Sequence, residues 1–358
     1  MKIMFRVDAS IQIGAGHVMR CLALADRLKK KGNQCIFLSR SHIGHLNELI
    51  VSKGHGIQSV ELDQAYACPE HEVVVNTHAH WLGTTWQSDA KQTNVVLARE
   101  QPDWLVVDHY SLDASWEKKI TPLVGKIMVI DDLADRKHES DLLLDQTFGR
   151  EIDDYSGLVP KTCKVLTGAK YSLLREEFAE SREESLRRRE TGLLSNILIS
   201  MGAMDKDNFT SNVLRALKKC DLPDSTMITV VMGVNAPWVS DVRKVAVGMP
   251  WSIEVKVDVK SMAELMCNAD LAIGAAGSTA WERCTLGLPT IQMVTADNQV
   301  FVAQCLSAVG AVKKLENLDE LPFLINTALK WMPLVSNTCS MVTDGRGADK
   351  VVSELEAL

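Results

Sequence analysis

Arg6-Val-Asp-Ala-Ser-Ile-Gln-Ile-Gly-Ala-Gly-His-Val-Met-Arg-Cys-Leu-Ala-Leu-Ala25 is the segment from which the fold of this chain is most readily predicted. An apolar run over residues 2–7 leads into it and predicts a first β-strand, after which Gly14 and Gly16 form a loop. A helix follows, with His17 at its start. A strand, a glycine loop and a helix N-terminus form the open end of a βαβ unit, where outward N–H groups favour anions, so we expect ligand chemistry here. The apolar face of the predicted helix comprises Val18, Cys21, Leu22, Ala25 and Leu28.

Length and charge limit the possible classes of protein. A chain of 358 residues, 46% of them hydrophobic, exceeds what one core usually holds, so we expect two domains. The net charge of −7 argues against a nucleic-acid partner or an anionic membrane surface, since both need a basic face. The chain has no apolar run of about eighteen residues, and Arg6 and Asp8 interrupt what would be the apolar part of a signal peptide. We therefore expect a cytoplasmic protein.

Cysteine and histidine usage gives no sign of a metal site. The nine cysteines include no Cys-x-x-Cys pair, so we expect buried, reduced thiols rather than a disulfide framework. Several of the nine histidines gather near a polar segment and invite a zinc interpretation. A structural zinc site needs four ligands in a closed geometry, which such a segment does not favour, so we expect no metal and no cofactor. The histidines in question are His42, His45, His71, His78 and His80.

The first half continues with βαβ rhythm, and one long segment interrupts it. Residues 34–40 and 57–61 predict strands and 46–53 a helix, before residues 64–92 break the alternation. This segment carries Trp81 and Trp86 among polar residues. Long loops are often functional, yet aromatic side chains also anchor surface excursions to a core, and both interpretations stay open.

Acidic residues follow three predicted buried strands. Residues 104–108, 127–130 and 142–144 are continuous apolar runs, and each ends in a cluster that contains aspartate. Open α/β sheets bind ligands along the edge where parallel strands end. Aspartate is also a common helix N-cap and turn former, so part of this set can serve capping instead.

A charged run divides the chain. Residues 175–190 are almost all Arg, Glu or Ser, which is typical of a solvated helix or linker. A new βα series then begins, with strands predicted near 196–200, 226–232, 252–257, 271–273 and 290–294. We therefore expect an α/β protein of two Rossmann-like domains, 1–190 and 191–358, with a final helix over 348–358 that can pack on either domain.

A glycine-rich loop in the second half is the stronger phosphate candidate. Ile273-Gly-Ala-Ala-Gly-Ser-Thr-Ala-Trp-Glu-Arg-Cys284 joins a strand to a helix through small residues and two hydroxyls, a setting that suits a diphosphate. Thr279 to Glu282 also matches a capping box, so Glu282 remains open between cap and ligand contact. A weaker glycine loop lies at Ser200–Asn208, and Asn298 and Gln299 are expected at the same edge of the sheet.

These motifs together resemble the bacterial UDP-2,4-diacetamido-2,4,6-trideoxy-β-L-altropyranose hydrolases of pseudaminic acid biosynthesis. The resemblance spans Arg6 to about Gly310, and Ala203 is a departure where many relatives carry a second glycine. It implies a GT-B-type arrangement of the two domains around a central cleft, similar to the peptidoglycan N-acetylglucosaminyltransferase. The motifs that carry it are Arg6-Val-Asp8, Ile13-Gly14-x-Gly16-His17-Val-Met-Arg20-Cys21, Val107-Asp-His-Tyr110, Ile130-Asp-Asp-Leu-Ala-Asp-Arg136 and Gly274-Ala-Ala-Gly-Ser-Thr-x-Trp-Glu282.

The resemblance also implies a reaction and the residues that perform it. Water attacks the anomeric carbon of the UDP-sugar, the C–O bond breaks with inversion, and UDP and the free sugar leave. We expect a monomer that binds sugar on its first domain and UDP on its second. The catalytic residues expected are His17, Tyr110 and Asn298; the substrate-binding residues expected are Asp8, Gly14, Gly16, Arg20, Gly202, Gly277, Ser278, Thr279, Glu282 and Gln299.

The implied reaction requires only one general base. UDP is a good leaving group because a diphosphate spreads its charge, so N–H dipoles near residues 277–280 can stabilise its departure and only the water needs activation. His17, at a helix N-terminus where the dipole disfavours imidazolium, suits that task, and Asp8 or another carboxylate is expected to orient it. The alternative for His17 is a buried or merely sugar-binding histidine.

Two other functions remain open at this point. A GT-B glycosyltransferase would transfer the sugar of a UDP-N-acetylated donor to an acceptor instead of water, and with a lipid acceptor it usually shows a membrane-docking face, which we do not find in the sequence. A non-catalytic nucleotide-sugar binding protein would keep the loop at Ser278 to Glu282 without needing His17. The presence of His17 favours the hydrolase.

Overall fold

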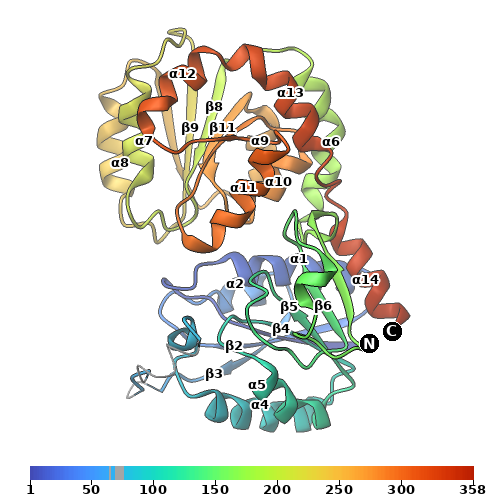
Figure 1. The fold of residues 1–358 in the computed structure, drawn as a ribbon. Helices are drawn as coiled ribbons and strands as arrows, with labels where there is room; N and C mark the ends of the chain where they lie inside the picture. The colour runs from blue at the N-terminus through green and yellow to red at the C-terminus, as the bar shows by residue number, and fades with distance from the viewer. Residues whose placement is uncertain (64–65, 69–75) are drawn as a thin grey trace. The chain divides into compact units, whose positions relative to one another are not determined.

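The computed structural model describes residues 1–63, 66–68 and 76–358, and it divides them into two compact units. The first unit consists of Met1–Leu173 together with Ala348–Leu358, and the second of Leu174–Gly347. Each unit is a parallel β-sheet with helices on both faces (Figure 1). This is the α/β class expected from the alternation of apolar runs and amphipathic stretches.

The sheet of the first unit has the strand order β3-β2-β1-β4-β5-β6-β7 within the described residues. Its pairs are parallel, so all of these strands end at the same edge. The strands are β1 (Lys2–Val7), β2 (Gln34–Arg40), β3 (Gly56–Val60), β4 (Trp104–Asp108), β5 (Lys126–Ile130), β6 (Leu142–Asp145) and β7 (Lys164–Thr167). The helices are α1 (Gly16–Lys30), α2 (Asn47–Ser52), α4 (Trp86–Glu100), α5 (Ala114–Ile120) and α14 (Gly347–Ala357), with 3-10 turns η1 (Ala79–Leu82), η2 (Thr121–Leu123), η3 (Ile152–Tyr155) and η4 (Ala169–Tyr171).

Strand β1 shows why the apolar runs are continuous rather than alternating. Ile3, Phe5 and Val7 face the core that also holds α1, whereas Met4 faces the core on the opposite side of the sheet. A strand buried on both faces needs apolar residues at consecutive positions. Helices α1 and α14 cover one face of this sheet, and α4 and α5 cover the other (Figure 1).

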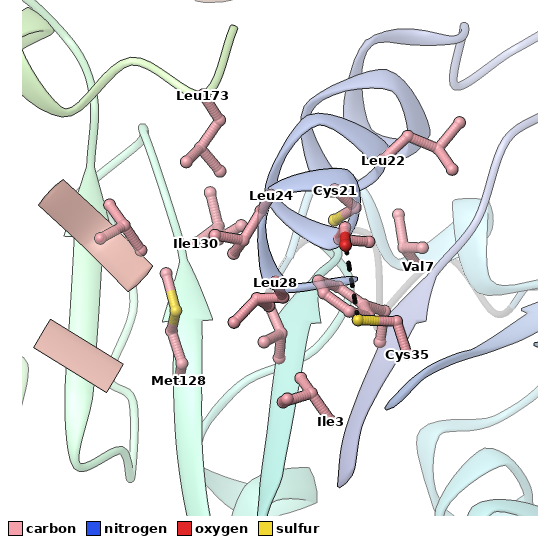
Figure 2. Close-up of a cluster of buried hydrophobic side chains, with 14 of the residues drawn as sticks. Ile3, Val7, Cys21, Leu22, Leu24, Leu28, Cys35, Met128, Ile130 and Leu173 are labelled. Carbon is pink, nitrogen blue, oxygen red and sulfur yellow. Dashed lines mark hydrogen bonds between the residues drawn. The ribbon is translucent and has the colours of Figure 1, made fainter. Parts of the chain in front are cut away.

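The first core is built around α1, as the periodicity predicts. Figure 2 shows Leu24 and Leu28 of α1 lying over Ile3 and Ile130 of the sheet. The thiol of Cys35 in β2 donates to the carbonyl of Ala25, with 3.6 Å between the two atoms, the dashed line of Figure 2. No disulfide joins the nine cysteines, all of which lie in the described part of the chain; six are buried as expected, whereas Cys68, Cys163 and Cys305 are half-buried.

The boundary between the units differs from the one expected near Glu190. The charged run forms helix α6 (Glu176–Arg189), and this helix belongs to the second unit. Arg189 donates to the carbonyls of Met266 and Ala269 at the end of α9 (Met262–Asn268), and Ser185 donates to the carbonyl of Leu286. The run is therefore a packed helix rather than a solvated linker, because its arginines satisfy carbonyls that a helix end leaves unpaired.

The final helix packs on the first unit. Val351, Val352 and Leu355 of α14 are fully buried in the same core as α1. The side chain of Arg27 on α1 pairs with Asp349 at the start of α14. The chain thus crosses from the first unit to the second at Leu173 and returns after Gly347.

The sheet of the second unit has the strand order β10-β9-β8-β11-β12-β13, again parallel throughout the described pairs. Its strands confirm the predicted βα series: β8 (Asn196–Ser200), β9 (Met227–Met232), β10 (Ser252–Val257), β11 (Leu271–Ala275), β12 (Thr290–Met293) and the short β13 (Lys313–Lys314). The remaining helices are α7 (Phe209–Leu217), α8 (Val239–Val247), α10 (Thr279–Thr285), α11 (Val300–Ala308), α12 (Leu321–Asn326) and α13 (Ala328–Ser340), with 3-10 turns η5 (Asp297–Gln299) and η6 (Leu318–Glu320).

Candidate active site

His17 is held by a carboxylate from the neighbouring strand. Its Nδ1–H donates to Oδ1 of Asp108, with 2.6 Å between the two atoms. Asp108 is fully buried at the end of β4, where it lies opposite Val7 of β1. With Nδ1 engaged by Asp108, Nε2 is the nitrogen that can accept a proton. The sequence left open which carboxylate orients His17, and the structure assigns this role to Asp108 rather than Asp8.

Arg20 keeps Asp108 ionised. One turn along α1 from His17, its Nε and Nη2 donate to the two oxygens of Asp108, each over 2.7 Å. Burial alone would raise the pKa of this carboxyl, but Arg20 and then His17 hold the pKa well below its usual range. Nη1 of Arg20 also donates to Asp132 over 2.8 Å. This guanidinium, expected to contact substrate, is therefore engaged by two carboxylates.

Tyr110 lies beside His17, with the two rings edge to face and their centroids 4.6 Å apart. Its hydroxyl donates to Oδ1 of Asp132, and the residue is only 3% exposed. Burial, together with Asp132, raises the pKa of this phenol well above its ordinary value. Tyr110 therefore stays protonated at neutral pH, and its expected catalytic role remains a prediction.

Asp8 lies in a separate buried network. Its carboxylate accepts two hydrogen bonds from Arg6, the shorter of 2.6 Å, and one of 2.7 Å from the backbone N–H of Arg40. Arg6 and Arg40 both also donate to Asp89 on α4. Asp8 is fully buried and its charge is matched within the fold. Its oxygens join strands β1 and β2, and the expected contact of Asp8 with substrate remains a prediction.

The loop that contains Gly14 uses its own N–H groups. The hydroxyl of Ser10 accepts from the N–H of Gln12 and of Ile13, over 3.1 and 2.9 Å, and the carbonyl of Ser10 accepts from Gly14 over 2.8 Å. Gly14 has φ +84°, in the left-handed region that favours glycine, and exposed Gly16 begins α1. Because these three N–H groups bond within the turn, they are not available to an anionic ligand.

The second loop leads from β11 into α10. Ser278 is exposed, is the N-cap of α10, and makes no side-chain hydrogen bond to the helix. Thr279 is the first residue of α10 rather than its N-cap, so the capping box considered for Thr279 to Glu282 does not form. Gln299 brings η5 close to this loop: its Nε2 lies 3.7 Å from the place where a Cβ on Gly277 would be. The neighbouring Asn298 is exposed. Gly277, Ser278 and Gln299 are thus together, as the sequence predicts.

Glu282 is turned toward Arg175 instead of folding back on its own helix. Its Oε1 lies 3.8 Å from Nη2 of Arg175, the residue that precedes α6. Burial raises the pKa of the Glu282 carboxyl to about 7, and Arg175 opposes that rise. A carboxyl that titrates near neutral pH can accept hydrogen bonds from hydroxyl groups or donate one. Sequence reasoning missed Arg175, and no spacing rule would have found it.

A buried arginine supports the same loop. Arg283 is 2% exposed; its Nη2 donates to the carbonyl of Ala275 over 2.7 Å and its Nη1 to the hydroxyl of Thr279 over 3.1 Å. Burial lowers the pKa of Arg283 to about 10, and in the part of the chain that the structure describes no carboxylate forms an ion pair with it. A Cβ on Gly274 would lie 2.8 Å from Nη1, so this glycine makes room for the arginine. Sequence reasoning missed Arg283. The sequence signal that could have indicated it is a charged residue four positions after Thr279 on a helix face that is otherwise buried.

The glycine loop that follows β8 leaves free space around Gly202. Gly202, at the end of β8, has φ +92°, and a Cβ added there would have no heavy atom within 4 Å. The departure Ala203 is exposed, and its carbonyl accepts from the N–H of Gly233 over 3.0 Å. The side chain of Ala203 is therefore accommodated at the surface without crowding the loop.

The described residues offer no cluster of metal ligands. Within residues 1–63, 66–68 and 76–358, no group of three or more His, Cys, Asp or Glu is arranged to hold a metal ion. His42 instead lies 3.6 Å from Asp8, and His71 is outside the described residues. The same part of the chain contains no helix that is long and apolar enough to cross a membrane.

Comparison with curated proteins confirms the resemblance drawn from the motifs. The chain is 26% identical over 311 residues to the UDP-2,4-diacetamido-2,4,6-trideoxy-beta-L-altropyranose hydrolase of Campylobacter jejuni, covering 87% of this chain and 97% of that protein. It is 25% identical over 318 residues to a spore coat polysaccharide biosynthesis protein of Bacillus subtilis, covering 88% and 83%. An uncharacterized protein of Methanocaldococcus jannaschii is 26% identical over 299 residues; the match covers 81% of this chain and only 55% of that longer protein. No protein-family profile matches the chain.

Solved structures confirm the fold. The MurG protein of Acinetobacter baumannii superposes with a TM-score of 0.64 at 17% identity, covering 100% of this chain and 99% of that one. The calicheamicin glycosyltransferase gives a TM-score of 0.61 at 14% identity, covering 99% and 98%. The chain therefore has a GT-B-like α/β fold of two parallel-strand sheets with interleaved helices.

Proposed function

We propose that this chain is an enzyme acting on nucleotide sugars, and specifically that it hydrolyses UDP-2,4-diacetamido-2,4,6-trideoxy-β-L-altropyranose. The products are UDP and the free 2,4-diacetamido-2,4,6-trideoxy-L-altrose, formed with inversion at the anomeric carbon. Similarity to the Campylobacter jejuni hydrolase over 87% of the chain supports the substrate. The similarity to a polysaccharide biosynthesis protein supports the broader class.

The pairing of His17 with ionised Asp108 is the observation that carries the proposal. Nε2 of His17 accepts a proton from water as the water oxygen bonds to the anomeric carbon. The bond from that carbon to the β-phosphate oxygen breaks, and its electron pair leaves with UDP. Asp108 holds the ring and stabilises the imidazolium that forms. The 2.6 Å hydrogen bond between the two side chains supports this division of roles.

The leaving group needs stabilisation rather than a strong acid, because a diphosphate disperses its charge. We assign this task to the loop at Gly277 to Thr279, where small residues and two hydroxyls allow a phosphate to approach. Arg283 supports the assignment: its hydrogen bond to the Thr279 oxygen directs the Thr279 hydroxyl proton outward. We also assign Glu282 to the ribose hydroxyls, as the resemblance implies. Asn298 and Gln299 flank the same loop.

A glycosyltransferase is the second candidate, because the fold is shared with transferases such as the calicheamicin enzyme. The same base could deprotonate an acceptor hydroxyl. The two reactions differ in what the donor sugar meets at its anomeric carbon. A hydrolase turns over with the UDP-sugar alone, whereas a transferase requires the acceptor.

The deciding experiment incubates the protein with this UDP-sugar in oxygen-18 water and follows both products by mass spectrometry and NMR. We expect turnover without an acceptor, one labelled oxygen in the sugar, no label in UDP, and the inverted anomer as the first product. Label in UDP would exclude C–O cleavage. Turnover only after an acceptor is added would replace the hydrolase with the transferase.

A further inference from the structure

The segment before α4 carries two tryptophans whose environments differ. Trp86, the first residue of α4, packs against the core between the sheet and α4. Trp81, in η1, instead contacts the rings of the candidate active site. The two interpretations left open by the sequence thus apply to different residues: Trp86 is the anchor, and Trp81 reaches the residues around His17.

Trp81 completes a cluster of aromatic rings around the base. It stacks on Tyr110 with centroids 5.5 Å apart and planes 25° from parallel, and the His17 ring lies edge-on at 6.3 Å. His78 closes the cluster, with centroids 4.6 Å from Trp81 and 5.0 Å from Tyr110. Burial lowers the pKa of His78, and Arg136 adds to this effect, so its ring is neutral near pH 7. The guanidinium of Arg136 lies 5.7 Å from the centre of the Tyr110 ring, so the cluster is an aromatic surface next to a proton acceptor, with one cation on its Tyr110 side.

Accessibility separates the two stacked rings. Tyr110 is only 3% exposed, and its hydroxyl is taken by Asp132. Trp81 is half-buried, so part of its indole faces solvent. Of the two stacked residues, Trp81 is therefore the one more accessible to a ligand.

Hydrogen bonds before Trp81 in the chain and a glycine after it constrain the backbone of the segment that carries this residue. Before it, the amide of Asn76 donates to the carbonyl of Tyr110 over 2.8 Å, and the hydroxyl of Ser111 donates to the carbonyl of His78. After it, Gly83 has φ +67°, and a Cβ there would come within 2.8 Å of Leu62. These contacts constrain the backbone of the segment that carries Trp81, and the ring contacts with His78 and Tyr110 place its indole, which favours a preformed binding surface.

We propose that Trp81, with His78 at its edge, forms the surface that binds the pyranose ring of the donor sugar, and that Tyr110 is a positioning residue beneath it. A pyranose has one face of C–H groups, and a sugar with acetamido and C6 methyl groups adds apolar carbon that an indole can cover. With His17 at the edge of the indole, a ring lying on Trp81 presents its anomeric carbon to Nε2. The identity of the sugar rests on the proposed function, whereas the surface rests on the ring geometry.

The kinetic test compares Trp81→Ala, Trp81→Phe and the matched control Trp86→Phe from the same segment. We expect Trp81→Ala to raise KM for the UDP-sugar about tenfold while the Kd for UDP alone stays unchanged, because UDP lacks the pyranose. Trp81→Phe should recover most of the loss, and Trp86→Phe should leave KM unchanged. Wild-type KM in Trp81→Ala would overturn the proposal, as would an equal loss of UDP affinity.

A binding test is independent of hydrolysis. The protein is labelled with 5-fluorotryptophan, the Trp81 fluorine resonance is assigned by its loss in Trp81→Phe, and the His17→Asn variant, which lacks the proposed base, is titrated with the UDP-sugar and with UDP. We expect the sugar nucleotide to shift the Trp81 resonance and UDP to leave it in place. An unshifted Trp81 resonance at saturation overturns the proposal. A shift of the Trp81 resonance in His17→Asn, combined with a wild-type protein that hydrolyses no UDP-sugar, would retain the binding surface and reject the proposed function.

Discussion

His17 owes its orientation to a carboxylate 91 residues away along the chain. Asp108 reaches it because β4 pairs with β1 directly, so that the end of β4 lies beside the start of α1. Arg20, on the next turn of α1, donates to the same carboxylate. The three side chains form a buried unit in which the charges of Asp108 and Arg20 compensate and the imidazole is left with one free nitrogen.

Replacing Asp108 tests this unit. In Asp108→Asn we expect kcat to fall about 10²–10⁴-fold with little change in KM, because the amide no longer fixes the tautomer or stabilises the imidazolium. Steady-state kinetics with the UDP-sugar measure this, and an unchanged Kd for UDP shows that the second unit is intact. A kcat within a few-fold of wild type would remove Asp108 from the mechanism.

Glu282 makes the stability of the second unit depend on pH. Its pKa of about 7 in the fold exceeds the ordinary 4.5, so the folded state binds the proton more tightly than the unfolded state. The stabilisation is fully present below pH 4.5 and is lost as the pH rises through 7. Wild type should therefore lose up to roughly 3 kcal/mol relative to Glu282→Gln between these limits.

Urea unfolding of both proteins at pH 4.5 and pH 8 measures that difference. The exposed Glu264 supplies the control, since Glu264→Gln should show no comparable change. If the free energy of unfolding changed equally with pH in wild type and in Glu282→Gln, the pKa of the Glu282 carboxyl would not be perturbed by its surroundings.

At the scale of elements, the ends of β4, β5 and β6 collect the acidic residues, as expected for one edge of a parallel sheet. They do not share one role. Asp113 caps α5 by accepting from the N–H of Ser115 over 2.7 Å, whereas Asp108 and Asp132 join His17, Arg20 and Tyr110. The capping interpretation is therefore confirmed for Asp113, whereas Asp108 and Asp132 hold the side chains of the candidate site and ligand binding by this set remains a prediction.

Helix α6 shows how a charged sequence can be structural. Arg189→Met removes hydrogen bonds to the carbonyls of Met266 and Ala269, and these buried acceptors lose their partner. We expect the free energy of unfolding of the second unit to fall by about 1–3 kcal/mol. The matched variant Arg187→Met, at an exposed position of the same helix, should change it by less than about 0.5 kcal/mol. Denaturant titration of the two variants measures the contrast; equal stabilities would mean that α6 is held by other contacts.

For the whole molecule, the residues proposed for sugar chemistry and those proposed for UDP lie in different units. His17, Tyr110 and Trp81 belong to the first, and Ser278 and Glu282 to the second. Neither unit alone carries a complete set. Helix α14 returns to the first unit, so the stability of the first unit depends on the packing of this helix.

This dependence predicts a local effect of substitutions in α14. Val352→Asp places a charge in the core that α14 shares with α1, and we expect hydrogen exchange to accelerate in β1 and α1 while α7 and β8 keep their protection. Ser353→Asp, at the exposed neighbouring position, should leave exchange unchanged. Accelerated exchange confined to the second unit would contradict the assignment of α14 to the first.

The sequence by itself determined the α/β class, most strand and helix positions, and the residue types at both loops. Apolar periodicity encodes these because burial of one helix face or of both sheet faces acts over a few residues. The motifs also determined the resemblance that the comparisons confirm.

Only the tertiary structure decided which partners these residues have. It assigned Asp108 rather than Asp8 to His17, placed the charged run of α6 in the second unit, returned α14 to the first, and brought Trp81 onto Tyr110. Each of these depends on which strands and helices become neighbours. Periodicity records how buried a position is, but not which distant side chain buries it.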